Sequence, residues 1–269
     1  MTIKLVCIDI DDTLLNSKRV VMPTTRDAIT AAIAAGVHVA LCSGRPLAGV
    51  RPFLNELGMT RDDQYVITFN GAVVESVTGR VLHNKRLPEN AYATLAAYAR
   101  EHNLPFNIVD ADSTIITPDR DIDAFTVVQA AENSAGLLVR DVGDLATDVV
   151  PIKGIFCGDE AMLDAAEDDV RATLGADYAV IRAGRNFIEL MAPGVDKGSG
   201  VAQLAAHLGI NPDEIMALGD EGNDIAMFDY VGLAVAMGNG SDEAKAHANV
   251  VTASNDDDGL ALALKKYVL

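Results

Sequence analysis

Apolar runs and helical segments alternate at both ends of the chain, and this alternation restricts the fold to layers of strands and helices. Residues 3–10 form a mainly apolar run, rich in β-branched residues, that stops at an acidic turn, as expected for a buried strand. Residues 23–35 have alanine and isoleucine at helical spacing, Gly36 favours a helix end, and residues 37–42 form a second apolar run. This order predicts two parallel strands joined by a helix.

The same alternation continues beyond this unit and returns near the carboxyl terminus. Residues 46–57 are expected to form a helix, residues 65–69 a strand, and residues 76–79 the turn of a hairpin. Towards the end of the chain, helices are expected at residues 198–208, 224–230 and 258–266, and strands at 215–218, 233–236 and 250–252. Both ends therefore predict α/β structure.

The middle of the chain has a different character. Strands are expected there at residues 106–109, 114–117, 149–156, 178–181 and 187–190, and helices at residues 89–102 and 160–174. Strands that follow one another in this way favour a mixed α+β module with paired strands. We therefore expect a Rossmann-like parallel-sheet core made of residues 1–82 and 190–269, with an inserted α+β domain at residues 83–189.

Composition limits the partners of the chain. It has 269 residues, 49% of them hydrophobic, which is enough to bury a sizeable core. Asp and Glu number 39 against 21 Lys and Arg, and the resulting net charge of −18 repels nucleic acids and anionic membranes. Three separated cysteines predict reduced, buried thiols, and the absence of a targeting or membrane-spanning pattern predicts a cytoplasmic protein. A homodimer is left open.

Three carboxylates follow the first expected strand. Asp9, Asp11 and Asp12 lie where strand ends of an open α/β sheet present ligand sites. Clustered carboxylates repel one another unless a cation offsets them, and Mg²⁺ prefers such oxygen ligands. The alternative is an acidic turn that caps a following helix, for which Asp12 or Thr13 would suffice.

A second candidate site follows the next strand of the amino-terminal half. Ser43, Gly44 and Arg45 precede Pro46, which opens an expected helix. A hydroxyl, free backbone N–H groups and a helix start suit a phosphate, and Arg45 adds a forked donor. An ordinary strand-to-helix turn explains the same residues equally well.

Two further polar segments lie near the carboxyl terminus. Asp220 and Asp224 belong to a Gly-Asp-Glu-Gly-Asn-Asp turn that again follows an apolar strand. A second acidic turn at a strand end strengthens the prediction of a metal site. Lys197 begins an expected helix, where the helix dipole disfavours a cation. Either an anionic neighbour or simple exposure to solvent accounts for this lysine.

Together these segments resemble the haloacid-dehalogenase-like hydrolases, in the order Asp9-x-Asp11, Ser43, Lys197 and Gly219-Asp220-x-x-Asn223-Asp224. The resemblance to the Cof-type branch extends over almost the whole chain and includes Cys42-Ser43-Gly44-Arg45-Pro46, Phe69-Asn70-Gly71-Ala72, Val195-Asp196-Lys197-Gly198 and Asn223-Asp224-Ile225-Ala226-Met227. Two positions depart from the pattern. Asp12 stands where the family usually has glycine, and Ser43 replaces the frequent threonine while keeping the hydroxyl.

The resemblance implies a Mg²⁺-dependent phosphatase with a covalent intermediate. Asp9 would attack phosphorus, and Asp11 would serve as general acid and base. Mg²⁺ would be held by the carboxylates of Asp9 and Asp220 and by the backbone carbonyl of Asp11, with Asp224 supporting the metal or Lys197. The expected contacts to the phosphoryl group are the Ile10 backbone, Ser43, Gly44, Lys197 and Asn223, with Ser43 and Lys197 counted as catalytic.

The inserted domain would be a lid over the substrate. Only the interval between Ser43 and Lys197 is long enough to hold a domain, which agrees with the lid position of Cof-type enzymes. The expected substrate contacts are Arg45, Asn70, Arg182 and Glu189, with Arg185 and Asn186 nearby. Those in the lid are equally well interpreted as solvated loop residues.

The predicted substrates are small phosphorylated metabolites, sugar phosphates in particular. A phosphomutase, which returns the phosphoryl group to another hydroxyl, remains an alternative. A non-catalytic phosphosugar sensor is another, although a sensor needs no acid and base such as Asp9 and Asp11. A receiver domain groups similar residues but is far shorter, and it needs no insertion.

Overall fold

The computed structural model describes residues 2–269 and divides the chain into two compact units. The first unit holds the segment that ends at Gly44, together with Val50–Asn84 and Asp196–Leu269; the second holds Arg45–Gly49 and Lys85–Val195. The first unit stops at Asn84 and resumes at Asp196. The sequence pattern predicts these two boundaries at residues 82 and 190. That the second unit acts as a substrate lid stays a prediction.

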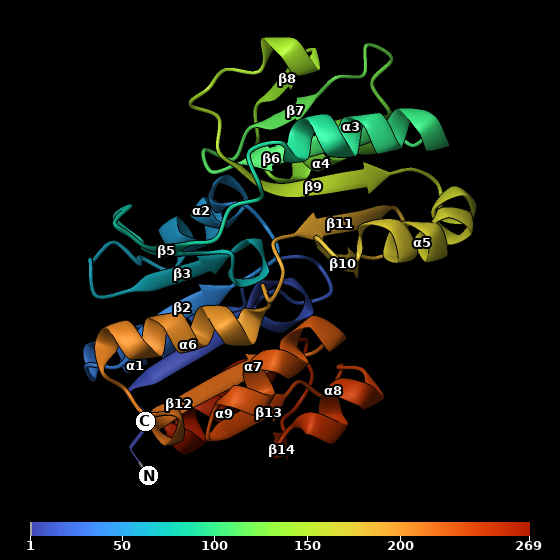
Figure 1. Cartoon of the computed structure of the whole chain (residues 1–269). Coiled ribbons are helices and arrows are strands. Elements are labelled where there is room, and N and C mark those ends of the chain that lie inside the picture. Colours follow the sequence, from blue (N-terminus) through green and yellow to red (C-terminus); the bar gives the residue numbers. More distant parts are fainter. Residues whose placement is uncertain (1) are drawn as a thin grey trace. The chain divides into compact units, whose positions relative to one another are not determined.

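The first unit is built on one eight-stranded sheet with the order β14-β13-β12-β1-β2-β3-β4-β5 (Figure 1). The strands are β1 (Leu5–Asp9), β2 (His38–Cys42), β3 (Tyr65–Thr68), β4 (Val73–Ser76), β5 (Val81–Asn84), β12 (Ile215–Gly219), β13 (Leu233–Ala236) and β14 (Val250–Val251). Neighbours from β14 to β3 are parallel, whereas β3, β4 and β5 form antiparallel pairs. The expected α/β core and its hairpin are confirmed.

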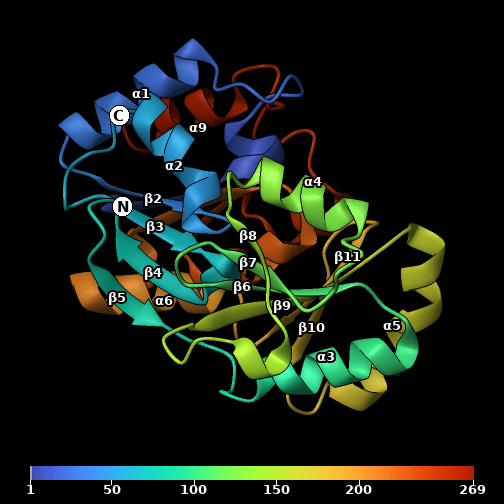
Figure 2. The same cartoon turned by 90° about the horizontal axis from the view of Figure 1, so that it is seen from above.

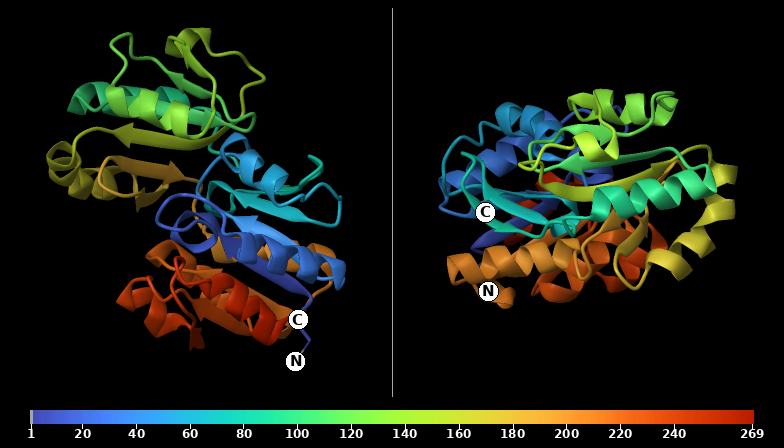
Figure 3. Two further views of the ribbon diagram at one scale, coloured as in Figure 1. Left: turned by 180° about the vertical axis from the view of Figure 1, so that it is seen from behind. Right: turned by 45° about the horizontal axis from the view of Figure 1, so that its top comes forward.

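Helices cover both faces of this sheet, as continuous apolar strands require. They are α1 (Pro23–Ala34), α2 (Leu47–Glu56), α6 (Lys197–Leu208), α7 (Ile225–Tyr230), α8 (Asp242–His247) and α9 (Gly259–Tyr267). Val201 and Leu204 of α6 and Phe228 of α7 pack with Leu5 and Cys7 of β1 in one buried cluster. α1 and α9 lie on the opposite face from α6 (Figures 2 and 3). The helices cover the faces of the sheet, so polar side chains gather at the edge where the parallel strands end.

The second unit is a mixed α+β module around a six-stranded sheet, ordered β10-β11-β9-β6-β7-β8. Its strands are β6 (Phe106–Asp110), β7 (Ile115–Thr117), β8 (Leu137–Val139), β9 (Pro151–Cys157), β10 (Ala179–Arg182) and β11 (Phe187–Met191). All neighbours are antiparallel except β7 and β8. The expected paired strands are confirmed.

Helices pack on both faces of the second sheet as well. Leu95 of α3 (Ala91–His102) and Leu163 of α5 (Glu160–Leu174) share a buried cluster with Phe106 and Phe156. α4 (Ala124–Glu132) lies on the opposite side from α3 (Figure 2), where the side-chain amide of Asn107 donates to Thr126 and Gln129. One face is therefore apolar and the other partly polar.

Several short elements were not anticipated from the sequence. They are a π-helical turn at Ile10–Leu14, α4, β8 and α8. Each is short, and α4 and α8 begin at the capping side chains Asp123 and Ser241 rather than at a long periodic pattern. No helix among the described residues has the length and apolar character needed to cross a membrane.

Candidate active site

Three neighbouring parallel strands bring the candidate residues to one edge of the first sheet. β1 lies between β12 and β2, with Ile8 opposite Leu218 and Asp9 opposite Cys42. Asp9 ends β1, Ser43 follows β2 and Asp220 follows β12. Because parallel strands point the same way, these three residues emerge at the same carboxyl edge.

The turn after β1 directs the next acidic residues. Ile10–Leu14 form a π-helical turn in which Asp12 has φ 57° and ψ 8°, so its backbone is left-handed. Thr13 is buried, and its hydroxyl donates to Oδ1 of Asp220 over 2.8 Å. Asp11 is half-exposed, and Arg19 approaches its carboxylate at 3.4 Å. The turn therefore connects the end of β1 directly to the end of β12.

Lys197 enters the site from the first residue of α6. The N-cap carboxylate of Asp196 accepts from the backbone N–H of Ser199, which fixes the start of the helix. A Cβ at Gly198 would lie 2.1 Å from the carbonyl oxygen of Ala226, so only glycine allows α6 to approach α7 this closely. The Lys197 side chain is 1% exposed, and its Nζ lies 2.6 Å from Oδ1 of Asp9.

Asp224 orients this lysine and the neighbouring turn at once. Its Oδ1 lies 2.6 Å from Nζ of Lys197, and its Oδ2 accepts from the backbone N–H groups of Asp220 and Glu221. A Cβ at Gly219 would lie 2.5 Å from the Asp224 carboxyl carbon, so that position must be glycine. Asp224 therefore acts as a support, since both of its oxygens are engaged by protein groups.

The local charges leave the site short of positive charge. Burial raises the pKa of Asp9 well above its usual value, and the nearby Asp224 and Asp220 raise it further against the opposing effect of Lys197. Burial raises the pKa of Asp220 to about 7, although the Thr13 hydroxyl opposes this shift. Burial alone would lower the pKa of Lys197, but the charges of Asp224 and Asp9 raise it overall. Three carboxylates thus share one lysine.

A divalent cation fits this arrangement. Oxygen atoms of Asp9, Asp220 and Asp224 lie within 4.8 Å of one another, and all three residues are buried. Carboxylate oxygens are the donors that Mg²⁺ prefers, and a second positive charge would offset the excess negative charge. Because Asp224 is held by Lys197 and two backbone N–H groups, Asp9 and Asp220 are the carboxylates best placed to face a metal.

The expected phosphate contacts occupy the same edge of the sheet. Ser43 is buried, its backbone N–H donates to the carbonyl of Ile67, and Gly44 lies against the side chain of Asn70. Ile10 follows Asp9 directly, within the π-helical turn. Asn223 is exposed in the short helical turn that contains Asp224. The structure therefore places these residues on the loops that follow β1, β2 and β12.

The remaining candidates for substrate binding have different surroundings. Arg45 precedes α2, and its guanidinium donates to the carbonyl of Glu132 over 3.5 Å. Asn70 is buried in the turn after β3 and has φ 52°. Glu189 on β11 is buried in the second unit, where its Oε1 lies 2.6 Å from Nζ of Lys153 on β9. Both side chains lie on the sheet face opposite α3 and α5.

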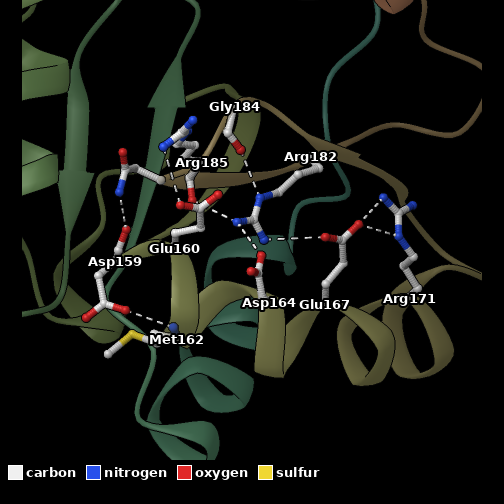
Figure 4. A network of polar contacts seen from close by, with 11 residues as sticks. Asp159, Glu160, Met162, Asp164, Glu167, Arg171, Arg182, Gly184 and Arg185 are labelled. Carbon is white, nitrogen blue, oxygen red and sulfur yellow. Dashed lines mark hydrogen bonds and ion pairs between the residues drawn. The ribbon is translucent and has the colours of Figure 1, made fainter.

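Arg182 is engaged within the second unit. Its guanidinium donates to the carboxylates of Asp164 and Glu167 on α5 and to the carbonyls of Gly184 and Arg185 (Figure 4). These bonds tie the turn between β10 and β11 to α5. That Arg182 also binds substrate stays a prediction.

The sequence pattern does not predict two contributors to these clusters. It indicates Thr13 only as a possible helix cap, yet the Thr13 hydroxyl holds Asp220. Its position four residues after Asp9, within the same turn, was the available signal. Lys153 lies in an apolar strand without any motif, so nothing in the sequence pointed to its pairing with Glu189.

Comparison with known proteins agrees with this geometry. Residues 6–264 match the family model described as haloacid dehalogenase-like hydrolase. The protein YxeH of Bacillus subtilis is 35% identical over 99% of this chain and 98% of its own. The 5-amino-6-(5-phospho-D-ribitylamino)uracil phosphatase YwtE of the same organism is 27% identical over 96% of each chain.

A solved structure matches over the whole length as well. It is that of the sugar phosphatase BT4131, of subclass IIB of the superfamily, and it has a TM-score of 0.81 and 26% identity over 98% of each chain. The sequence match, the fold and the acidic strand ends are thus in agreement. This chain belongs to the haloacid dehalogenase-like hydrolase family.

Proposed function

We propose that this protein is a Mg²⁺-dependent phosphatase that hydrolyses small phosphorylated metabolites, sugar phosphates in particular, through an aspartyl-phosphate on Asp9. The observation that carries this proposal is the contact of Lys197 with both Asp9 and Asp224 beside the buried Asp220. YwtE is named as a phosphatase and BT4131 as a sugar phosphatase, which supports this activity.

Asp9 is the nucleophile in this proposal. A carboxylate oxygen of Asp9 attacks phosphorus, a new O–P bond forms, and the bond from phosphorus to the leaving oxygen breaks. Lys197 lies 2.6 Å from Asp9, so it orients the carboxylate and offsets charge on the transferring group. The buried position of both side chains limits competition from bulk water.

Asp11 is the general acid and base. It lies two residues beyond Asp9, on the π-helical turn, and is half-exposed rather than buried. Asp11 gives a proton to the departing alkoxide and then takes one from the water that attacks the aspartyl-phosphate. That attack breaks the bond between Asp9 and phosphorus and releases inorganic phosphate.

Asp9 and Asp220 would hold the metal through their carboxylates, and Asp11 through its backbone carbonyl. When bound, Mg²⁺ supplies positive charge that stabilises the phosphoryl group in the transition state. Thr13 and Asp224 hold the Asp220 segment in place for this role. Ser43, Gly44, Asn223 and the Ile10 backbone are the proposed donors to the phosphoryl oxygens.

Sugar phosphates are the proposed substrate class because BT4131, which is similar along its whole length, is named as a sugar phosphatase. Arg45, Asn70 and Glu189 remain the candidate contacts to the rest of the substrate. Arg182 stays a candidate as well, and its guanidinium also bonds to Asp164 and Glu167 of its own unit. A cytoplasmic location and a possible homodimer remain predictions.

Phosphate release from p-nitrophenyl phosphate, with Mg²⁺ or with EDTA, tests the proposal. We expect turnover only with Mg²⁺, a loss on the order of 10⁴-fold or more in Asp9→Asn, and phosphorylated Asp9 after an acid quench. The control is Asp62→Asn, which removes an exposed carboxylate that lies before the start of β3 and pairs with Arg80. This variant should keep full activity. Wild-type-like turnover in Asp9→Asn would refute the assignment.

The same assay separates the alternatives when sugar phosphates replace the aryl ester. Free inorganic phosphate supports hydrolysis, whereas an isomerised ester supports the phosphomutase. Tight binding of the ester without turnover supports the sensor. Ranking sugar phosphates and the phosphoribityl compound named for YwtE by kcat/KM then tests the substrate class.

A further inference from the structure

The turn that carries Asp11 contains a backbone conformation that its sequence disfavours. Asp12 has φ 57° and ψ 8°, in the left-handed region where a residue with a Cβ is strained and glycine is not. Asp11 immediately precedes Asp12, so the path of the turn at Asp12 sets where the Asp11 side chain points. Other contacts must therefore hold Asp12 in this conformation.

One such contact comes from the loop after β13. The side-chain amide of Asn239 donates to the backbone carbonyl of Asp12 over 2.8 Å. This loop is itself anchored, because the backbone N–H of Met237 donates to the carbonyl of Gly219, and that of Gly238 donates to Ala253. Asn239 therefore reaches Asp12 from a fixed base beside the end of β12.

A second asparagine completes the arrangement. The backbone N–H of Asn255 donates to Oδ1 of Asn239 over 2.9 Å, which fixes the orientation of the Asn239 amide. The buried side chain of Asn255 donates to the carbonyl of Leu15 over 2.9 Å, and Leu15 closes the turn by donating to Ile10. We name Asn239 and Asn255 the amide clasp. It binds the turn at both Asp12 and Leu15.

We propose that the amide clasp positions Asp11 as the general acid by holding Asp12 in its left-handed conformation. The inference rests on the proposed phosphatase function and adds a positioning element to it. Asn239 acts on the backbone of the turn, and it is neither a catalytic residue nor a metal ligand in this proposal. Without the clasp, the turn relaxes and Asp11 donates its proton less effectively.

Leaving-group dependence tests this role. p-Nitrophenolate leaves without a proton, whereas the alkoxide of a hexose 6-phosphate needs one. The value of kcat/KM reports the steps up to and including departure of the leaving group. We expect Asn239→Ala to lower kcat/KM by about tenfold or more for the hexose 6-phosphate and by less than about threefold for p-nitrophenyl phosphate. The ratio of kcat/KM for the hexose 6-phosphate to kcat/KM for p-nitrophenyl phosphate does not depend on the fraction of folded enzyme.

Changes at Asp12 test the backbone mechanism. In the Asn239→Ala background, Asp12→Gly should restore much of the lost ratio, because glycine adopts the left-handed conformation without strain. Asp12→Ala in the same background should lower the ratio further. Asp12→Asn removes the charge but tolerates this conformation, so alone it should leave the ratio near that of the wild type.

The matched control is Asn249→Ala, which removes another asparagine bond to backbone, from Ala234, without touching the turn. It should leave the ratio unchanged. Two outcomes would overturn the role of the amide clasp: equal losses on both esters in Asn239→Ala, or the same ratio for Asp12→Gly and Asp12→Ala in the Asn239→Ala background. If the wild type is active and Asp9→Asn is not, the proposed function still stands in either case. An inactive wild type would overturn the proposed function as well. If Asn239→Ala does not fold, Asn239→Ser replaces it.

Discussion

Two lysines are buried among the described residues, one in each unit, and they differ in their counter-charges. In the first unit, Nζ of Lys197 lies 2.6 Å from Asp9 and 2.6 Å from Asp224, with Asp220 nearby. In the second unit, Nζ of Lys153 lies 2.6 Å from Glu189, on the neighbouring strand. The two sites have the same lysine-to-carboxylate distance but a different balance of charge.

The difference concerns the number of carboxylates that surround each lysine. Lys153 and Glu189 bring one cation and one anion into contact. Lys197 faces more carboxylates than it can neutralise. Burial, and then the neighbouring carboxylates, raise the pKa values of Asp9 and Asp220. Because buried charge without compensation is costly, such an excess supports the proposal that a further cation binds here.

Of the two buried lysines, Lys197 is expected to show the larger effect when it is replaced by methionine. This substitution removes a cation that faces both the nucleophile and its support, so turnover should fall on the order of 10²–10³-fold. In metal-free protein the free energy of unfolding should also fall by about 3–5 kcal/mol, because two carboxylates lose their buried partner. Urea denaturation with and without Mg²⁺ measures this loss, and added Mg²⁺ should recover part of it. Turnover within a few-fold of the wild type would contradict the role given to Lys197.

The pair in the second unit should behave differently when it is removed as a whole. Lys153→Met or Glu189→Gln alone should lower the free energy of unfolding by about 3 kcal/mol, since each breaks the buried contact between the two charges. The double variant Lys153→Met/Glu189→Met should come within about 1 kcal/mol of the wild type. A double-mutant cycle in urea measures the coupling. Additive losses would show that the pair is not coupled.

The sequence predicted the Lys197 site far better than the Lys153 pair. Asp9 and Asp220 follow apolar runs, and parallel strands bring such positions to one edge, so their convergence follows from the pattern. Lys153 meets Glu189 only through the antiparallel register of β9 and β11. Sequence spacing does not reveal that register, because the strands are separated by α5 and β10.

Arg182 and the turn after β1 show two further limits. An arginine near the end of the inserted domain is consistent with either a substrate contact or a structural role, and the sequence pattern does not reveal its contacts with Asp164 and Glu167. Asp12 stands where the family usually has glycine, and only the structure shows that this chain keeps the left-handed backbone with a side chain there. In both cases tertiary contacts determine the outcome.

Thr13→Val tests a smaller contribution to the first cluster. The hydroxyl of Thr13 donates to Oδ1 of Asp220 over 2.8 Å, and valine keeps the shape but loses this bond. We expect the Mg²⁺ concentration for half-maximal activity to rise about tenfold, the usual scale for groups that orient a metal ligand. Thr13→Ser keeps the hydroxyl and should stay close to the wild type. An unchanged Mg²⁺ requirement in Thr13→Val would argue against Asp220 as a ligand.

The smallest expected effect concerns the exposed carboxylate of Asp62. Folding lowers its pKa, whereas folding raises the pKa of the buried Asp9 and Asp220. Hydrogen bonds from Thr78 and Ser76, and then Arg80, lower the pKa of Asp62 from 3.8 to about 2. A pKa lowered by folding stabilises the folded protein above the unfolded value, so this contribution is complete near pH 5 and is lost as the pH falls from about 4 to about 2. Asp62→Asn should therefore lower Tm slightly at pH 7, and the difference from the wild type should shrink towards pH 2. A difference that grows as the pH falls would mean that folding raises the pKa of Asp62, as burial does for Asp9 and Asp220.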